Sequence, residues 1–481
     1  MTASVPTINT AINNGAVPSS PGPHNQLAYV VPAKPLVPEF LTPRERRFAL
    51  ALFFLGIALF FVVNIHRVAI PGQIFSELQA ELGASASAIT GLGTSFMYIY
   101  AITQLLAGVL VDRYGGMRVL VVGGLVMSIG SLLFAFSTTF WMLFVSRGLI
   151  GFGCGCAYLS LVKECARLYP NRFTTAIGFV ILFGFSGGIA GTYPFVCTVN
   201  AYGWRTGMLT IAALGGLILV GMIVLWRSVR KPPINHAATL SFKPYFQGFS
   251  NLHNLRGVFS FSIGFGLYYV VLTIIGKKFL EDVGGLTPQM ASLSCAAMVL
   301  LSAVSNQVTG ILSSLMGNRR RSFILWQTGF VPAGCLLVLA ALLFLPRGAV
   351  LGYVLVAAFL VITLVSGFTP ITNAFVLEVN PKALTGVGVG ISNFSDFAFV
   401  AIFSNLSGGL LDLFNKQSKV DAAGALHYPD AAYLVLFGFF FLIGVGAHVI
   451  AYRIPETHGR NIHKGELNTV RFLGLRLNLR S

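Results

Sequence analysis

Two arginine residues, Arg67 and Arg147, lie within apolar stretches that are long enough to cross a bilayer. A charge near the bilayer centre costs at least about 2.5–3.5 kcal/mol, so each arginine requires a partner or a function. In the first, second, fourth and fifth apolar stretches, the only acid is Glu164, near one end. We therefore predict that both guanidinium groups bind a negatively charged ligand. The alternatives are that Arg67 extends to the membrane surface and that Arg147 is structural.

Two further titratable residues could carry a proton, His66 beside Arg67 and Asp396 in the second half of the chain. Imidazole titrates near physiological pH, and ionisable groups within membranes often form proton relays. We predict that one of them is the proton-coupling residue; the alternatives are hydrogen bonding by His66 and an ion pair or packing role for Asp396. Neutral polar residues of the apolar stretches are expected as additional ligand contacts: Tyr98, Asn306, Gln307, Asn373 and Asn393.

The turn GVLVDRYGGMR, residues 108–118, places an acid and two bases between two apolar stretches. Gly108 would let two helices approach closely, and Gly115 with Gly116 would allow a sharp reversal. Asp112 would cap a helix or pair with an arginine of the other half of the chain. We interpret the turn as a conformational latch that consists of Gly108, Asp112, Arg113, Gly115 and Arg118.

The composition of the chain indicates the kind of structure that holds these residues in place. The chain has 481 residues, of which 55% are hydrophobic and 10% charged, and its mean hydropathy is +0.78. Soluble domains usually carry about 25% charged residues, so we predict an all-α polytopic membrane protein. Twelve apolar runs are candidate spans: 48–70, 86–111, 117–137, 140–166, 173–198, 204–226, 257–280, 288–316, 322–345, 349–377, 385–413 and 431–453.

The distribution of Lys and Arg predicts the orientation. With the N-terminus inside, the inside segments carry 23 of these residues, the outside segments 6 and the spans 3. This split favours cytoplasmic N and C termini, and it explains the net charge of +17 without nucleic-acid binding. The six outside residues are Arg205, Lys277, Lys278, Arg347, Lys416 and Lys419.

The chain divides into two similar halves. Gly108, Leu110, Gly115 and Arg118 recur at an offset of 202, as Gly310, Leu312, Gly317 and Arg320. We predict two six-helix bundles, a plan that is typical of transporters. The predicted segments are a disordered tail over 1–44, a bundle over 45–226, a cytoplasmic loop over 227–256, a second bundle over 257–453 and a basic tail over 454–481. Within the N-terminal segments, Thr42, Pro43 and Glu45 predict a capped helix start.

The turn resembles the loop signature of the major facilitator superfamily, and RGLIGFG at 147–153, YGWR and PETHGR at 455–460 are also similar to that superfamily. The resemblance covers about residues 45–460 and implies twelve helices in two bundles around a central cavity. It places Arg67 and Arg147 on spans that face the cavity. Ser314 stands where the second copy of the signature often has Asp, so the latch would be asymmetric.

The stretch from Asn64, NIHRVAIPGQIF, resembles the anion:cation symporter branch, which carries small organic anions. The branch has Asp-Arg where this chain has His66-Arg67, and often a carboxylate where it has Cys154. The usual proton-coupling acids are therefore absent, which leaves coupling to His66 or Asp396.

We predict secondary active uptake of a small organic anion, driven by protons, by a monomer in a bacterial inner membrane. An exporter of drugs or metabolites is the first alternative, although GFSGGIAGTYP in span five lacks the Gly-Pro pair of the antiporter signature. A membrane sensor is a more remote alternative. We expect no enzyme activity, cofactor or metal, because no catalytic set, metal-ligand cluster or phosphate-binding loop is evident.

Overall fold

A computed structural model of the protein describes residues 42–169, 172–229, 234–235, 247–249, 251–381, 384–422, 424–462, 469–472 and 475–478. The chain separates into two units, Met1–Phe40 and Leu41–Ser481, and the helices belong to the second. The predicted tail over 1–44 lies outside the described residues except for its last three. Large parts of the predicted loop over 227–256 and of the tail over 454–481 also lie outside them.

The N-terminal half begins with a capped helix, as predicted. The backbone N–H of Glu45 donates to Thr42 Oγ1 at 3.3 Å, and the N–H of Thr42 donates to Glu45 Oε2 at 2.9 Å. Its elements are α1 (Pro43–Ala69), η1 (Gly72–Ile74), α2 (Phe75–Leu82), α3 (Ala86–Tyr114), α4 (Gly116–Ala135), α5 (Phe140–Gly155), α6 (Ala157–Leu168), α7 (Phe173–Ala190), α8 (Tyr193–Tyr202) and α9 (Trp204–Trp226).

The C-terminal half is again largely helical, with two short hairpins. Its elements are α11 (Leu252–Val270), η3 (Val271–Ile275), α12 (Gly276–Asp282), α13 (Pro288–Leu315), α14 (Arg320–Phe344), α15 (Ala349–Thr363), η4 (Leu364–Phe368), α16 (Thr369–Val379), α17 (Thr385–Asp412), η6 (Asn415–Gln417), β1 (Lys419–Val420), β2 (Leu426–His427), α18 (Asp430–Ala451), β3 (Thr469–Phe472) and β4 (Leu475–Asn478). The strands of each hairpin pair antiparallel, β1 with β2 and β3 with β4.

Within the described residues, twelve helical segments are long and apolar enough to cross a membrane, which confirms the predicted fold class. Their ends differ from the predicted spans by at most five residues. Several spans are interrupted: η3 is a π-helical turn within the span Leu252–Asp282, and η4 divides the span Ala349–Val379. Pro370 lies in the first turn of α16, where its missing N–H group is tolerated, so the helix breaks just before this proline.

Lys277 and Lys278, which were counted among the outside residues, lie at the end of the predicted span 257–280. Both residues lie in α12, within the span that ends at Asp282, and their side chains are 2% and 1% exposed. Each lysine pairs with an acid four residues later: Lys277 with Glu281 at 2.9 Å and Lys278 with Asp282 at 2.7 Å. The paired acids allow the two ammonium groups to be buried.

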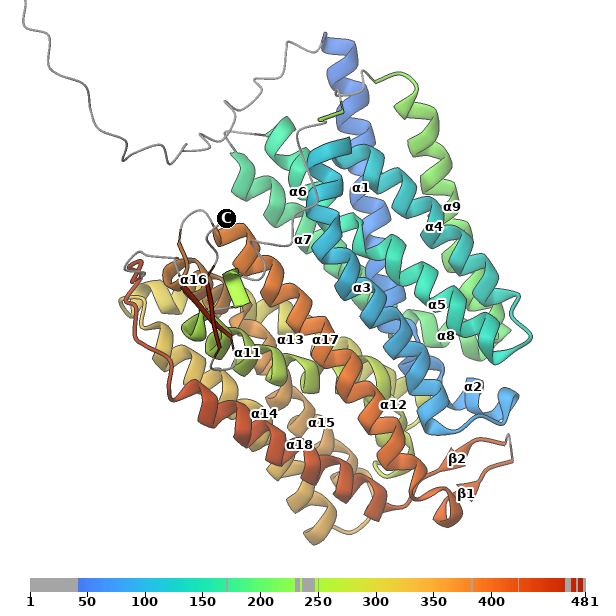
Figure 1. Cartoon of the computed structure of the whole chain (residues 1–481). Helices are drawn as coiled ribbons and strands as arrows, with labels where there is room; N and C mark the ends of the chain where they lie inside the picture. Colours follow the sequence, from blue (N-terminus) through green and yellow to red (C-terminus); the bar gives the residue numbers. More distant parts are fainter. Residues whose placement is uncertain are drawn as a thin grey trace, which may run out of the picture. The chain divides into compact units, whose positions relative to one another are not determined.

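The two halves contact each other mainly along α3 and α17, which lie side by side (Figure 1). Most of the hydrogen bonds between the halves, among the described residues, involve η1, α2 and the first part of α3. The backbone N–H groups of Ala86 and Ser87 donate to Asp412, and Ser292 Oγ donates to Gln73 Oε1 at 2.6 Å. We call this end of the bundle, away from Thr42, the closed end.

Close packing at the closed end depends on a glycine of α17. A Cβ atom at Gly408 would clash with Thr90 Oγ1 and would lie 2.6 Å from the Cα atom of Ser87. The neighbouring Gly409 has nothing within 4 Å of the equivalent position. Gly408 therefore permits the approach of α17 to α3, whereas Gly409 does not contribute to it.

We expect Gly408→Val to destabilise this packing by about 1–3 kcal/mol, because the added carbon atoms force the helices apart. Gly409→Val is the matched control, since it changes helix propensity equally and meets open space. Thermal unfolding of the purified proteins should give a lower melting temperature for Gly408→Val than for Gly409→Val. Equal melting temperatures would contradict the close-packing role.

Candidate functional site

Arg147, on α5, donates its hydrogen bonds to the end of α1. Its Nη1 lies 3.3 Å from the carbonyl oxygen of His66, and its Nη2 lies 2.9 Å from that of Ile70. The last carbonyl groups of a helix have no helical N–H partner, and burial of such groups is costly. The guanidinium carbon is 4.5 Å from the centre of the Phe96 ring. Arg147 thus supplies hydrogen-bond donors to the carbonyl groups at the end of α1 and attaches this helix end to α5.

Arg67, on the last turn of α1, is placed among three aromatic rings. Its guanidinium carbon lies 5.3 Å from the centre of Tyr100, 5.6 Å from Tyr269 and 5.0 Å from Phe397. Its Nη1 donates to Asn64 Oδ1 at 3.3 Å, and the side chain is 7% exposed. Among the described residues, no carboxylate forms an ion pair with Arg67. A buried cation without an acidic partner therefore lies between the halves, since Tyr100 is on α3 and the other two rings are on α11 and α17.

Asp396 immediately precedes Phe397 on α17. Its side chain is 6% exposed, and Oδ1 accepts a hydrogen bond from Ser262 Oγ at 2.5 Å. Because Phe397 contacts Arg67, the carboxyl group is one residue away in sequence from a ring of the arginine site. Successive side chains of a helix point about 100° apart, so the Asp396 carboxyl group itself contacts Ser262, whereas Phe397 faces Arg67.

His66 is completely buried, and neither ring nitrogen has a hydrogen-bond partner among the described residues. Its backbone carbonyl accepts from Arg147, so the residue belongs to the end of α1 that this arginine holds. Its proton-coupling role stays a prediction.

The structure does not gather the neutral residues that were predicted as ligand contacts. Tyr98 is 38% exposed, whereas Tyr100 on the opposite side of α3 contacts Arg67. Asn306 donates to the carbonyl oxygen of Ser302 at 2.8 Å, in its own helix. Gln307 is exposed, and Asn373 and Asn393 are half-buried. Their roles stay predictions.

The aromatic residues Tyr269 and Phe397 were not identified from the sequence. With 41 Phe and 15 Tyr in the chain, neither residue type carries a signal on its own. The one local indication is that Phe397 follows the acid Asp396.

The turn between α3 and α4 only partly agrees with its predicted geometry. Gly115 has φ +86°, as the predicted reversal requires. The predicted close approach at Gly108 is wrong, because a Cβ atom there would meet nothing within 4 Å. The predicted partners of Asp112 are also wrong: it pairs with Lys163 of the same half at 2.6 Å. Gly116 instead approaches the backbone of Ser160 closely.

The two remaining latch residues lie beside this turn. The Arg113 guanidinium carbon is 5.4 Å from the centre of the Tyr114 ring, and Arg118 donates to the Tyr114 carbonyl at 3.1 Å. Their predicted contribution to a conformational latch stays a prediction.

Two acids at the same end of the bundle are also neutralised within their own halves. Glu164 accepts from the backbone N–H of Met117 at 3.2 Å and pairs with Arg167 at 2.6 Å. Glu378 pairs with Arg320 at 2.9 Å and also accepts from Thr457 Oγ1. These charges stabilise the helix ends at which they lie.

Comparison with known proteins supports this architecture. The family model described as Major Facilitator Superfamily matches residues 52–404. A mutant form of the nucleoside transporter NupG has a similar fold, with a TM-score of 0.65 and 16% sequence identity over 84% of this chain and 99% of that chain.

Three curated relatives have different substrates or roles in their names. Sugar transport protein 12 of Arabidopsis thaliana is 30% identical, over 29% of this chain and 27% of the relative. Membrane sensor protein UhpC of Escherichia coli (strain K12) is 30% identical, over 39% of this chain and 42% of UhpC. Monocarboxylate transporter 13 of Bos taurus is 22% identical, over 77% of this chain and 85% of the relative. The matches to the first two therefore span less than half of each relative.

A single family model that spans most of the twelve helices, together with a solved transporter of the same fold, is sufficient for one assignment. The chain belongs to the Major Facilitator Superfamily and is a multi-pass membrane protein.

Proposed function

We propose that this transporter takes up a small organic anion together with protons, and that Arg67 is its principal anion ligand. The observation that carries the proposal is the environment of Arg67, a buried guanidinium group whose polar partners are the Asn64 amide and the Tyr269 hydroxyl, with no carboxylate partner among the described residues. An anionic substrate would supply the missing negative charge. Carboxylates bind arginine through two parallel hydrogen bonds, which gives both affinity and orientation.

The position of Arg67 suits alternating access. Rings from α3, α11 and α17 surround it, so its contacts belong to both halves. An anion that binds there would change interactions of the two halves at once, as rocking of the bundles around a central site requires. The three rings also exclude water, which strengthens the attraction between the guanidinium group and an anion.

The roles of the two arginines differ in this proposal. Both terminal nitrogens of Arg147 already donate to carbonyl oxygens of α1. Arg147 would therefore position Arg67 by holding the last turn of α1, and any direct contact with the substrate would be secondary.

Asp396 is the proposed proton carrier. A carboxyl group that gains a proton becomes neutral and no longer competes with the substrate for the positive field of Arg67. Its neighbour Phe397 contacts Arg67, and Ser262 supplies a hydrogen bond that either protonation state can keep. His66 is the alternative carrier, since it is buried without a hydrogen-bond partner among the described residues.

The likeness to monocarboxylate transporter 13 supports an anionic substrate, and the likeness to membrane sensor protein UhpC favours a second candidate, a sensor that binds without transport. Uptake of a radiolabelled anion into proteoliposomes distinguishes the two. Accumulation against a gradient supports the transporter, whereas saturable binding without accumulation supports the sensor.

We expect Arg67→Lys to weaken binding of carboxylate compounds about tenfold or more, and Arg67→Gln to weaken it further. Lysine keeps the charge but loses the planar fork, and a hydrogen bond to a charged group contributes about 1.5–3 kcal/mol. The measurement is thermal stabilisation of the purified protein by a panel of mono- and dicarboxylates. Arg347→Gln is the control, because Arg347 is exposed and far from Arg67 in sequence. This variant should bind the carboxylates as tightly as the unmodified protein. Preference of the unmodified protein for neutral or cationic compounds would refute the anion proposal.

A second prediction concerns coupling. Asp396→Asn should preserve exchange of substrate across the membrane but abolish accumulation driven by a proton gradient, because the amide cannot release a proton. Asp430→Asn, which removes an exposed acid, is the matched control and should leave accumulation intact. Both activities are measured in the same proteoliposomes. If Asp396→Asn still accumulates substrate and His66→Gln does not, the proton carrier is His66.

A further inference from the structure

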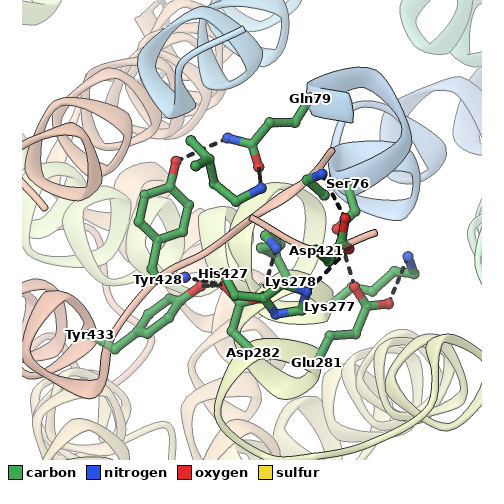
Figure 2. A network of polar contacts seen from close by, with 12 residues as sticks. Ser76, Gln79, Lys277, Lys278, Glu281, Asp282, Asp421, His427, Tyr428 and Tyr433 are labelled. Carbon is green, nitrogen blue, oxygen red and sulfur yellow. Dashed lines mark hydrogen bonds and ion pairs between the residues drawn. The ribbon is translucent and has the colours of Figure 1, made fainter. Parts of the chain in front are cut away.

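A buried carboxylate organises the closed end of the molecule (Figure 2). Asp282, at the end of α12, is fully buried. Its Oδ1 accepts from Lys278 Nζ at 2.7 Å, and its Oδ2 accepts from Tyr433 Oη at 2.7 Å and from the N–H of Tyr428 at 3.2 Å. The fourth contact is His427 Nδ1, 2.9 Å from Oδ1. The carboxylate thus joins α12, α18 and the hairpin β1–β2.

His427 bridges two carboxylates. While Nδ1 faces Asp282, its Nε2 lies 3.3 Å from Asp421 Oδ2, in the turn between β1 and β2. Ionised carboxylates only accept hydrogen bonds, and a neutral imidazole has a single N–H. Both contacts are therefore satisfied together only by the imidazolium form, which has an N–H on each nitrogen.

The hairpin that carries His427 also connects the two halves. The N–H of Leu426 donates to Gln79 Oε1 at 3.2 Å, and Gln79 Nε2 donates to Tyr428 Oη at 3.0 Å. Gln79 belongs to α2 of the N-terminal half, and its two partners are the residues on either side of His427. Because Leu426 and Tyr428 flank His427, a movement of His427 would also move the two hydrogen bonds that these residues make with Gln79.

The charges around His427 balance when the imidazole is protonated. Asp282 and Asp421 carry two negative charges, and Lys278 supplies one positive charge. The remaining charged groups at this surface compensate one another in part, as Lys277 contacts Glu281 at 2.9 Å and Glu77 of α2 at 3.9 Å. An imidazolium ion at His427 completes the neutralisation of the two aspartates, and Lys419, which lies opposite His427 in the register of the hairpin, adds a further positive charge.

We propose that His427 is a proton-binding site that fastens the hairpin β1–β2 to α12 and thereby stabilises contact between the two halves at the closed end. Protonation would favour the arrangement in which this end is closed, and loss of the proton would weaken it. The proposal concerns the gate alone and does not depend on the substrate, on Arg67 or on the residue that couples transport to protons.

The direction of the pH dependence follows from the contacts. The hydrogen bond with Asp282 raises the pKa of His427, and it outweighs partial burial and the nearby Lys278, which oppose the charged form; Asp421 adds to the rise. When the end opens and these contacts are lost, the pKa returns toward its ordinary value of about 6.5. Stabilisation of the closed end is therefore complete below about pH 6.5 and is lost as the pH rises through the raised pKa.

The experiment measures the width of the closed end by distances between two spin labels. Labels are attached to Thr138→Cys and Val350→Cys, exposed positions on the two halves at this end, in a Cys197→Ser background. Cys197 is replaced because it is exposed, whereas the other five cysteines are buried. The full-length protein is used without substrate, between pH 5.5 and 8.5.

We expect the population with the short distance to grow at least threefold relative to the long-distance population as the pH falls. His427→Gln should remove most of this response, whereas His253→Gln, which changes an exposed histidine of α11, should retain it. Asp421→Asn should shift the response to lower pH, because one negative charge is lost while the amide oxygen can still accept from the N–H of Ala425. A pH response that survives His427→Gln, or a distance that does not change with pH in the parent protein, would overturn the proposal.

Discussion

The hydrogen bonds from Arg147 to the end of α1 are the interaction on which the arginine site depends. In a medium without water, an unpaired carbonyl group is costly, and α1 stops at Ala69 inside the protein rather than at its surface. Arg147 compensates the carbonyls of His66 and Ile70, and Arg67 lies between them in sequence. One guanidinium group is thus used to position the other at a single helix end.

The closed end contrasts with the bracing at the opposite end of the bundle. Glu164 and Glu378 are neutralised within their own halves, so their ion pairs can persist while the halves move relative to each other. The polar contacts between the halves at the closed end include individual hydrogen bonds, such as Gln79 to Tyr428, with net contributions of about 1 kcal/mol each. Asp412 adds a negative charge at the N-terminus of α3, where the helix dipole favours it. Such a set of weak contacts suits an interface that must open and close.

Family membership determines less about the substrate than the local chemistry does. The relatives are named for sugars, for monocarboxylates and for sensing, and the structural neighbour is named for nucleosides. Their shared fold supplies two halves and a movable interface, and residues at that interface select the cargo. In this chain the distinguishing feature is Arg67 in its cage of three rings.

The twelve spans and the capped start at Thr42 could be predicted from the sequence, and the break before Pro370 also has a local cause. Each depends on residues near one another in the chain: a run of apolar side chains, a capping hydroxyl three residues before its acid, or a proline without an N–H group. The presence of Arg67, Arg147 and Asp396 in apolar surroundings was equally clear, because the cost of a buried charge depends on local hydrophobicity.

Only the tertiary structure decided which partners these residues have. Arg147 bonds to carbonyls about 80 residues earlier, Phe397 approaches Arg67 across more than 300 residues, and Lys163 rather than a residue of the other half pairs with Asp112. Lys277 and Lys278 are buried because acids on the next helical turn, Glu281 and Asp282, neutralise them. Charge and hydrogen-bond partners are chosen by distance in space, and that distance is set when the helices pack.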